Sequence, residues 1–418
     1  MKVRPIRKVV EQHAEAASFL WLRRDAAVKA PHYGLGNLVG LDDRVEAHLA
    51  GLRISGDTGW EVVQEMLAWR ESGELFAATQ IALSREDPTA LEGVLAIARD
   101  ASKSDPEVAR GSISAIGWAA WAEVAELVAR LMNSEDPWLR RVGVAGAAIH
   151  RRLTGDELMR LLDDRDPGVR ARASRACGEM NLGSLLRYLP LGDPDEDVTF
   201  WSAWAGAMLG DSRCLQGLMG FCRPDWSRAT ETVELLGRRL PLEEAIEFRG
   251  KLASSPGTLR LAIQAAGAIG SPGLVDWLLL QMEEPAVSRV AGEAFATITG
   301  ADLSFEDLDG PHPPGYVAGP SEDPSDENVA IDVDENLPWP DPERLRSWWM
   351  ERRSRLETGG RLLCGNAIDL KSAAEVMRTR RQRQRRAAAL ELVRLSGSKP
   401  PLIETRARAC RQQAGLEQ

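Results

Sequence analysis

The chain has 418 residues, of which 44% are hydrophobic and 27% charged, the balance of an ordinary globular protein with more than one domain. Its 52 Lys and Arg face 62 Asp and Glu, a net charge of −10, which argues against a protein that wraps nucleic acid. No apolar run reaches the roughly 18 residues of a membrane span, and no apolar signal core follows the basic first residues. We therefore expect a cytoplasmic protein that neither spans a membrane nor binds nucleic acid.

Residues 1–75 precede any clear repeat and are predicted to be a helical N-terminal cap. A helix predicted over 9–30 places apolar residues on one face at steps of three and four. Two further helices are predicted over 41–52 and 56–72. A stacked array needs an end that does not propagate stacking, and this segment can supply it.

Residues 76–300 carry a pattern that recurs about every 30 residues. Asp-Pro opens three clear units at Asp105, Asp136 and Asp166, which are 31 and 30 residues apart, and looser units follow. Asp suits a helix N-cap and Pro suits the first helical position, so each unit predicts two helices joined by short turns. Because neither helix can bury its apolar stripe alone, the units must stack. This predicts an all-α fold, an α-solenoid of short repeats.

Two other residue types recur within the units. Glycine falls where a left-handed C-cap would end a helix, at Gly117, Gly178 and Gly270. Arginine follows the turn, at Arg110, Arg140, Arg170 and Arg260. These arginines could form a ladder of partner contacts, or each could pair with a turn Asp or a carbonyl of the adjacent unit. We favour the structural interpretation, because a residue that every unit requires suits stacking.

Tryptophan is unusually frequent, with 13 residues against seven Phe and three Tyr. Trp118 and Trp121 share one helix face, and Trp201 and Trp204 share another. Exposed tryptophans would favour partner binding, whereas buried ones would fill gaps between Ala-rich layers. We favour the buried interpretation.

Residues 301–343 contain 13 acidic residues, no Lys or Arg, and several prolines, which predicts an acidic, Pro-rich linker. The region 344–418 is the opposite, with 18 basic and seven acidic residues, a net charge of +11. It is predicted to be a basic helical C-terminal region, with helices over 341–357 and 376–395.

The candidate residues for partner binding or interdomain docking all lie in this basic region: Trp348, Trp349, Arg378, Arg381 and Arg385. We expect the three arginines on one face of the helix over 376–395. They would serve either an anionic partner or docking on the acidic body. We favour docking, held mainly by apolar contacts through Trp348, Trp349, Leu390 and Leu392, because exposed ion pairs contribute little.

Sequence motifs give no sign of catalysis. The five cysteines lie far apart without a CxxC pair, which favours free thiols in a reducing compartment. The spacing of His13, His32 and His48 matches no usual zinc site. Phosphate-binding, dinucleotide-binding, zinc-protease and hydrolase motifs are all absent. We therefore predict no catalytic residue, no metal and no cofactor.

The repeat unit, D-P-x-V-R…A…G, resembles the short HEAT-like repeat of bacteria, also found in phycobilin lyases. Segments outside the repeats extend the likeness: 11–33, 41–52, 298–300, 335–342 and 381–392. Together they resemble an uncharacterised family of proteobacterial HEAT-like repeat proteins, often encoded near type VI secretion components. The resemblance implies a cytoplasmic accessory role in handling secreted cargo, and it brings no catalytic residues.

We accordingly expect a non-enzymatic scaffold or adaptor that binds a protein partner. Two alternatives stay open. One is an immunity-like inhibitory binding protein, and the other is a HEAT-fold enzyme or nucleic-acid binder. The net charge of residues 1–300, with 34 basic and 42 acidic residues, argues against a phosphate-binding groove.

Overall fold

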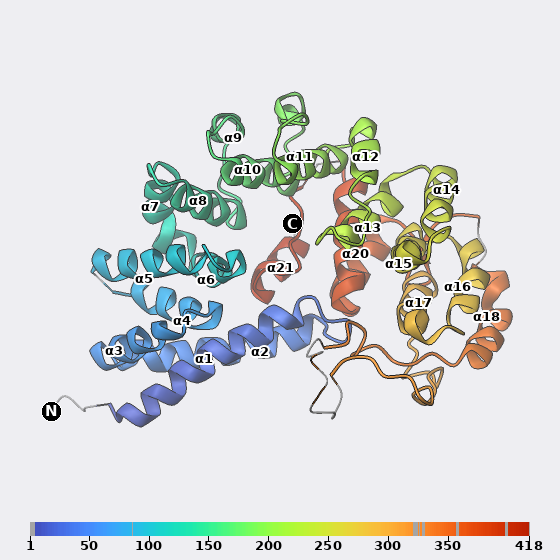
Figure 1. The fold of residues 1–418 in the computed structure, drawn as a ribbon, viewed down its shortest axis with the longest axis horizontal. Coiled ribbons are helices and arrows are strands. Elements are labelled where there is room, and N and C mark those ends of the chain that lie inside the picture. The colour runs from blue at the N-terminus through green and yellow to red at the C-terminus, as the bar shows by residue number, and fades with distance from the viewer. Residues whose placement is uncertain are drawn as a thin grey trace. The chain divides into compact units, whose positions relative to one another are not determined.

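A computed structural model describes residues 5–85, 87–320, 325, 327, 331–356, 359–397 and 400–417. These residues are mainly helical (Figure 1), and the strands among them form one two-stranded antiparallel sheet, β1 (Leu362–Leu363) with β2 (Asn366–Ala367). The predicted all-α class is therefore confirmed. In the part of the chain that the structure describes, no helix has the length and apolar composition that would cross a bilayer.

The chain forms two compact units. Unit 1 comprises the residues up to Lys29, Tyr33–Ala205 and the segment from Ile403 onward. Unit 2 comprises Ala30–His32 and Gly206–Leu402. Apart from the short piece Ala30–His32, the chain passes from unit 1 to unit 2 within the helix that spans Glu196–Met208 and returns to unit 1 at Ile403. The boundaries near 75, 300 and 343, which rest on the repeats and on composition, stay predictions.

Unit 1 is built of consecutive helices joined by tight turns. They are α1 (Arg7–Ala27), α2 (Leu35–Ile54), α3 (Asp57–Met66), η1 (Leu67–Trp69), α4 (Ser72–Leu83), α5 (Pro88–Ala101), η2 (Pro106–Val108), α6 (Ala109–Trp118), α7 (Trp121–Met132), α8 (Pro137–Ile149), α9 (Gly155–Leu162), α10 (Pro167–Glu179), η3 (Gly183–Tyr188), α11 (Glu196–Met208) and α21 (Ala409–Leu416). Alternate helices contact each other, α4 with α6, α6 with α8 and α8 with α10. Each of these also contacts the helix before it in the chain, as α8 contacts α7.

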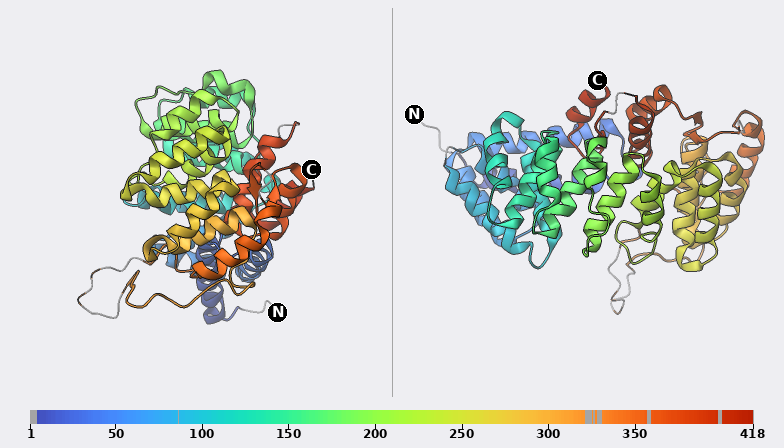
Figure 2. Two further views of the ribbon diagram at one scale, coloured as in Figure 1. Left: turned by 90° about the vertical axis from the view of Figure 1, so that its right-hand side faces the viewer. Right: turned by 90° about the horizontal axis from the view of Figure 1, so that it is seen from above.

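Unit 2 repeats this arrangement and adds the basic region. Its helices are α12 (Ser212–Met219), α13 (Ala229–Arg239), α14 (Leu242–Ala253), η4 (Pro256–Thr258), α15 (Leu259–Ile269), η5 (Pro272–Leu274), α16 (Val275–Gln281), α17 (Pro285–Thr299), α18 (Pro342–Leu356), α19 (Leu370–Thr379) and α20 (Gln382–Leu395). Here α13 contacts α15 and α15 contacts α17. Within each unit the successive helices lie side by side (Figure 2).

The Asp-Pro turns start helices as the sequence predicts. The Asp136 carboxylate accepts from the backbone N–H groups of Trp138 and Leu139, and the Asp166 carboxylate accepts from Val169. Asp105 caps η2 in the same way, through the N–H of Glu107. Each side chain satisfies a donor that the first helical turn leaves without a partner.

The repeated arginines bridge neighbouring turns. Arg140 donates through Nε and Nη2 to both oxygens of Asp164, at 2.9 and 2.8 Å. Arg170 repeats the contact one unit later with Asp193, and its Nη1 donates to the carbonyls of Asp164 and Arg165. The planar guanidinium matches a carboxylate in this two-point contact, so each turn is fixed to the next.

The other two repeat arginines have different partners. Arg110 pairs with Asp25 of α1 and with Glu107, and Arg260 pairs with Asp334. Asp334 lies in the stretch assigned to the linker, yet its side chain is only 4% exposed. The adjacent Asp332 pairs with Arg289 of α17, so the acidic residues around 332–334 are bound to repeat helices.

Two of the three glycines expected at C-caps have another role, and that prediction is wrong for them. Gly270 does end α15 with φ of 72°, in the left-handed region that favours glycine. Gly117 and Gly178 instead lie inside helices, where the next helix approaches closely. A Cβ atom at Gly178 would lie 2.9 Å from Cα of Ala205 and 2.6 Å from the Trp204 ring.

The predicted burial of tryptophan holds for Trp118, Trp201 and Trp204, which are 5 to 8% exposed. Trp69, at the C-terminal end of η1, is 75% exposed. Trp121 is half-buried, and Phe19 of α1 is 59% exposed, so aromatic rings fill space between the helices of unit 1 at some positions and lie on its surface at others.

Gly111 of α6 provides a test of close helix packing. A Cβ atom there would overlap the carbonyl oxygen of Ser72 on α4, so Gly111→Ala should destabilise unit 1 by about 1–3 kcal/mol. Gly93 of α5 is exposed and has open space, so Gly93→Ala should stabilise by about 0.5–1 kcal/mol. Urea unfolding followed by circular dichroism compares the two. Equal effects of both substitutions would contradict the assigned contact.

Arg170 provides a second test, of the bridges between turns. Arg170→Ala leaves Asp193, whose side chain is 7% exposed, without its two-point partner. We expect a loss of about 2–3 kcal/mol in the free energy of unfolding. The exposed Arg165 is the matched control, and Arg165→Ala should change stability by no more than about 0.5 kcal/mol. A loss for Arg170→Ala as small as that of the control would mean that the bridge does not stabilise the turns.

Candidate functional site

The last described residues, 403–417, form a segment that lies on the helices of unit 1. We call these residues the C-terminal segment. In Figure 1 its helix α21 faces the row formed by α2, α4, α6, α8 and α10. Contacts with α2, α6 and the ends of α8 and α10 hold it there. The strongest candidate site of the chain is therefore one that already holds a polypeptide.

A buried ion pair between α1 and α2 recognises the main chain of the C-terminal segment. Arg24 and Asp42 are 6% and 5% exposed, and Arg24 Nε donates to Asp42 Oδ1 at 2.9 Å. The other two nitrogens of Arg24 donate to the carbonyls of Arg406 and Ala407, each at 2.5 Å. Asp42 Oδ2 accepts from the N–H of Ala409 at 2.7 Å. We call Arg24 and Asp42 the main-chain clamp, because they bond to backbone groups of the segment and not to its side chains.

A tryptophan and a glutamate receive the side chain of Arg408. The guanidinium lies 4.4 Å from the Trp118 ring centroid, a cation–π contact, and Nη1 donates to the Trp118 carbonyl at 3.1 Å. Trp118 Nε1 in turn donates to Glu46 at 2.8 Å, and Glu46 lies 3.7 Å from Arg408. Burial acts to raise the pKa of Glu46, but the Trp118 hydrogen bond and the charges of Arg53 and Arg408 outweigh it and lower that pKa. Glu46 is therefore an anion facing the segment.

A neutral histidine receives Arg411. The Nη2 group of Arg411 donates to the Ala119 carbonyl at 2.9 Å and lies 3.3 Å from His150 Nδ1. His150 Nε2 is 3.0 Å from the Ile116 carbonyl, which fixes the proton on Nε2 and leaves Nδ1 as the acceptor. Burial lowers the pKa of His150 to about 4, and the nearby charge of Arg411 acts in the same direction. His150 is therefore uncharged at neutral pH.

The predicted tryptophans belong to unit 2. Trp349 is 1% exposed and donates to Asp276 at 3.1 Å, and Trp348 is 9% exposed and donates to Glu306 at 2.7 Å. The Trp348 ring also meets Phe295 edge to face. Both side chains thus fasten α18 to the helices around α16 and α17.

The predicted arginine face does not form. The expected helix over 376–395 is two helices, because α19 ends at Thr379 and α20 begins at Gln382, with extended backbone between them. Arg378 is exposed, Arg381 precedes α20 and donates to the His32 carbonyl, and Arg385 is fully buried. Arg385 Nε donates to the Met377 carbonyl at 2.7 Å, which ties the two helices together. Its burial lowers the pKa of Arg385 to about 10, so it is a core cation and not a surface ligand.

Sequence reasoning missed the clamp and the residues around it. Arg24, Asp42 and His150 stand in ordinary helical patterns, and nothing in their spacing connects them with residues near position 408. The signal that the sequence does offer is the close spacing of Arg406, Arg408 and Arg411, which a total charge does not capture.

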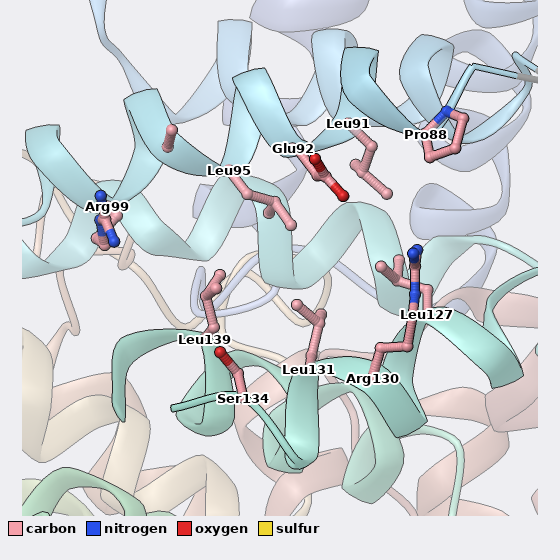
Figure 3. A pocket seen from close by; sticks show the side chains of 11 residues that line it. Pro88, Leu91, Glu92, Leu95, Arg99, Leu127, Arg130, Leu131, Ser134 and Leu139 are labelled. Carbon is pink, nitrogen blue, oxygen red and sulfur yellow. The ribbon is translucent and has the colours of Figure 1, made fainter. Parts of the chain in front are cut away.

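A separate apolar groove of about 280 Å³ lies between α5 and α7. Leu91 and Leu95 approach from α5, and Leu127 and Leu131 from α7 (Figure 3). Arg99 pairs with Asp136 at the rim. Its lining can hold an apolar group, but it offers few polar atoms with which to orient one.

Metal-binding and thiol chemistry find little support in the described residues. The described residues contain no group of three or more His, Cys, Asp or Glu side chains that could hold a metal. Two of the histidines considered above do meet, since Nδ1 of His13 lies 3.0 Å from Nδ1 of His48. All five cysteines are free, and burial raises the pKa of Cys177 and Cys222 to about 12.

Comparison with known proteins gives no relative from which a function could be transferred: no family model, curated protein or solved structure matches the chain.

His150 predicts an acid-sensitive contact. Its folded pKa of about 4 lies below the ordinary value of about 6.5, so the neutral form stabilises the fold above pH 6.5. Stability should fall as the pH drops from about 6.5 towards 4, because the protonated ring loses its acceptor and meets the Arg411 cation. The thermal midpoint of unit 1 should decrease by a few degrees between pH 7.5 and 5.

His150→Gln can keep both hydrogen bonds without titrating, so it should reduce that acid-induced decrease. His312→Gln, at an exposed position of unit 2, is the control and should leave the decrease unchanged. The same pH dependence in wild type and His150→Gln would mean that another group is responsible.

Proposed function

We propose that this chain is a non-enzymatic scaffold or adaptor that binds protein partners and is built as an α-solenoid of HEAT-like repeats. The observation that carries the proposal is the main-chain clamp of unit 1. Arg24 and Asp42 together make three hydrogen bonds to backbone groups of one polypeptide segment. A surface that recognises backbone groups suits a protein whose ligands are other polypeptides.

The pattern of helix contacts supports the solenoid. Each second helix contacts the second helix of the next pair, in α4, α6, α8 and α10 and again in α13, α15 and α17. Stability that depends on nearest neighbours is typical of repeat arrays, which bind partners along their extended faces. Residues 1–75 would cap this array, and the basic C-terminal region would complete it.

The chemistry of the side chains supports a non-enzymatic role in a reducing compartment. The buried thiols of Cys177, Cys222 and Cys364 have raised pKa values, so they are poor nucleophiles. Free cysteines suit the cytoplasm. The sequence resemblance to proteobacterial HEAT-like proteins supports the finer proposal, an accessory role in handling type VI secretion cargo.

Affinity capture from the native host tests the proposal. We call the surface of α2, α4, α6, α8 and α10 that faces the C-terminal segment the inner row. The bait is the full chain, beside two double variants. The inner-row variant carries Glu46→Ala and Arg175→Ala, because Glu46 lies 3.7 Å from Arg408 and Arg175 of α10 lies 3.7 Å from Glu404. The outer variant carries Glu92→Ala and Arg130→Ala, at the groove between α5 and α7. We expect a protein partner with the wild type and the outer variant, and at least a tenfold lower yield with the inner-row variant. The purified partner should then bind the purified chain in titration calorimetry.

Three other results would favour a different function. Capture of nuclease-sensitive nucleic acid, with salt-dependent binding, would favour the nucleic-acid alternative. A tight stoichiometric complex that neutralises a toxin would favour the immunity-like alternative. Turnover of a captured small molecule would favour an enzyme.

A further inference from the structure

We infer that the C-terminal segment is an exchangeable ligand of unit 1, and that a partner protein bearing a similar arginine-containing segment binds in its place. This inference rests on the proposed function, and it names the chemistry of the partner. The segment to be matched has arginines at 406, 408 and 411 around the buried Ala409.

The contacts of the C-terminal segment are those of a bound peptide more than of a core helix. Thr405, Ala409 and Gln412 are buried, and Ala409 alone joins the apolar cluster that contains Leu35 and Leu38. Most other side chains of the segment are half-buried or exposed. Polar contacts with the clamp and with Trp118 therefore carry most of its attachment.

The helix of the C-terminal segment depends on its site. It has only eight residues, and isolated helices shorter than about 12 residues are marginal in water. Inside the segment, Gln412 Nε2 donates to the Thr405 and Ala407 carbonyls, at 3.0 and 2.7 Å, which folds the extended part back onto the helix. Release would unfold these few residues and leave the repeat helices in place.

The site is chemically suited to arginine. Asp25 lies 3.9 Å from Arg406, and Glu46 lies 3.7 Å from Arg408, so two carboxylates face two guanidinium groups. The Trp118 ring adds a flat face, and the carbonyls of Trp118 and Ala119 accept from Arg408 and Arg411. A lysine would lack the planar fork that makes these contacts.

Covalent attachment of the C-terminal segment sets how tightly a partner must bind to displace it. Tethering gives a local segment concentration on the order of 1 mM. If the free segment binds with a Kd of about 10 µM, the tethered segment occupies its site about 99% of the time. An external segment then binds roughly 100-fold more weakly than it would to an open site. A partner with additional contacts on the repeat helices can overcome this factor.

The test uses full-length protein and a fluorescein-labelled synthetic peptide of residues 402–417. An open variant with Arg408→Ala and Arg411→Ala weakens only the chain's own segment and keeps the site. Fluorescence anisotropy should give at least tenfold tighter peptide binding to the open variant than to wild type. Binding should weaken when the salt concentration rises from 50 to 300 mM, because the paired charges are partly exposed.

Matched controls distinguish the opening of the site from a change in folding. Gln413→Ala, at an exposed position of the same segment, should bind the peptide as weakly as wild type. A peptide carrying Arg408→Ala and Arg411→Ala should bind the open variant at least tenfold less. Adding Glu46→Gln to the open variant should reduce binding of the native peptide by a similar factor, with an unchanged circular dichroism spectrum.

Three results would overturn the inference. The first is equal peptide affinity for wild type and open variant, and the second is no binding to either at 500 µM. The third is a wild-type dimer in sedimentation that the peptide dissociates, which would make the segment of a second copy the native occupant. Any of these, with a partner still captured through the inner row, would leave the proposed function standing.

Discussion

Close contact between successive helices is the constraint on which the rest of this protein depends. Most of the helices are short, and neither member of a pair can bury its apolar side without the next pair. The contact requires residues with almost no side chain where backbones approach, as at Gly111 against Ser72 and Gly143, where a Cβ atom would lie 2.6 Å from the Met132 nitrogen. Interiors packed to crystal density tolerate little change at such points.

Arginine side chains are the second feature that holds the structure together, and most of those described here bond to other groups of the chain. Arg170 and Arg140 bridge consecutive turns, Arg385 ties α19 to α20, and Arg238 pairs with Glu391, where both side chains are at most 3% exposed. Burying these cations is costly, so each is given a carboxylate or several carbonyls. Within unit 2, arginines of the basic region also pair with acidic residues of the repeat helices, Arg383 with Glu293 and Arg386 with Glu231 and Glu234.

The same chemistry links architecture to function in unit 1. Arg24 uses one nitrogen for Asp42 and two for backbone carbonyls of a segment more than 380 residues away in sequence. Elsewhere in the protein, arginine bonds to carboxylates and carbonyls stabilise a turn. In unit 1 the same kind of bond holds the C-terminal segment, which has few apolar contacts of its own. Under the proposed function, a scaffold whose site is filled by its own chain would stay closed until a partner with matching arginines binds.

The sequence by itself determined the helical class, the turns and the start of many helices. Asp-Pro at 136 and 166 predicts a capped helix because capping is local, and a period near 30 residues predicts stacked pairs. Only the tertiary structure decided what the remaining residues do. Gly178 serves a helix approach and not a C-cap, Arg385 is in the core, and Asp42 meets Ala409, since each role depends on a neighbour distant in sequence. Charge totals and helical periods carry no information about which distant side chain will fill a given space.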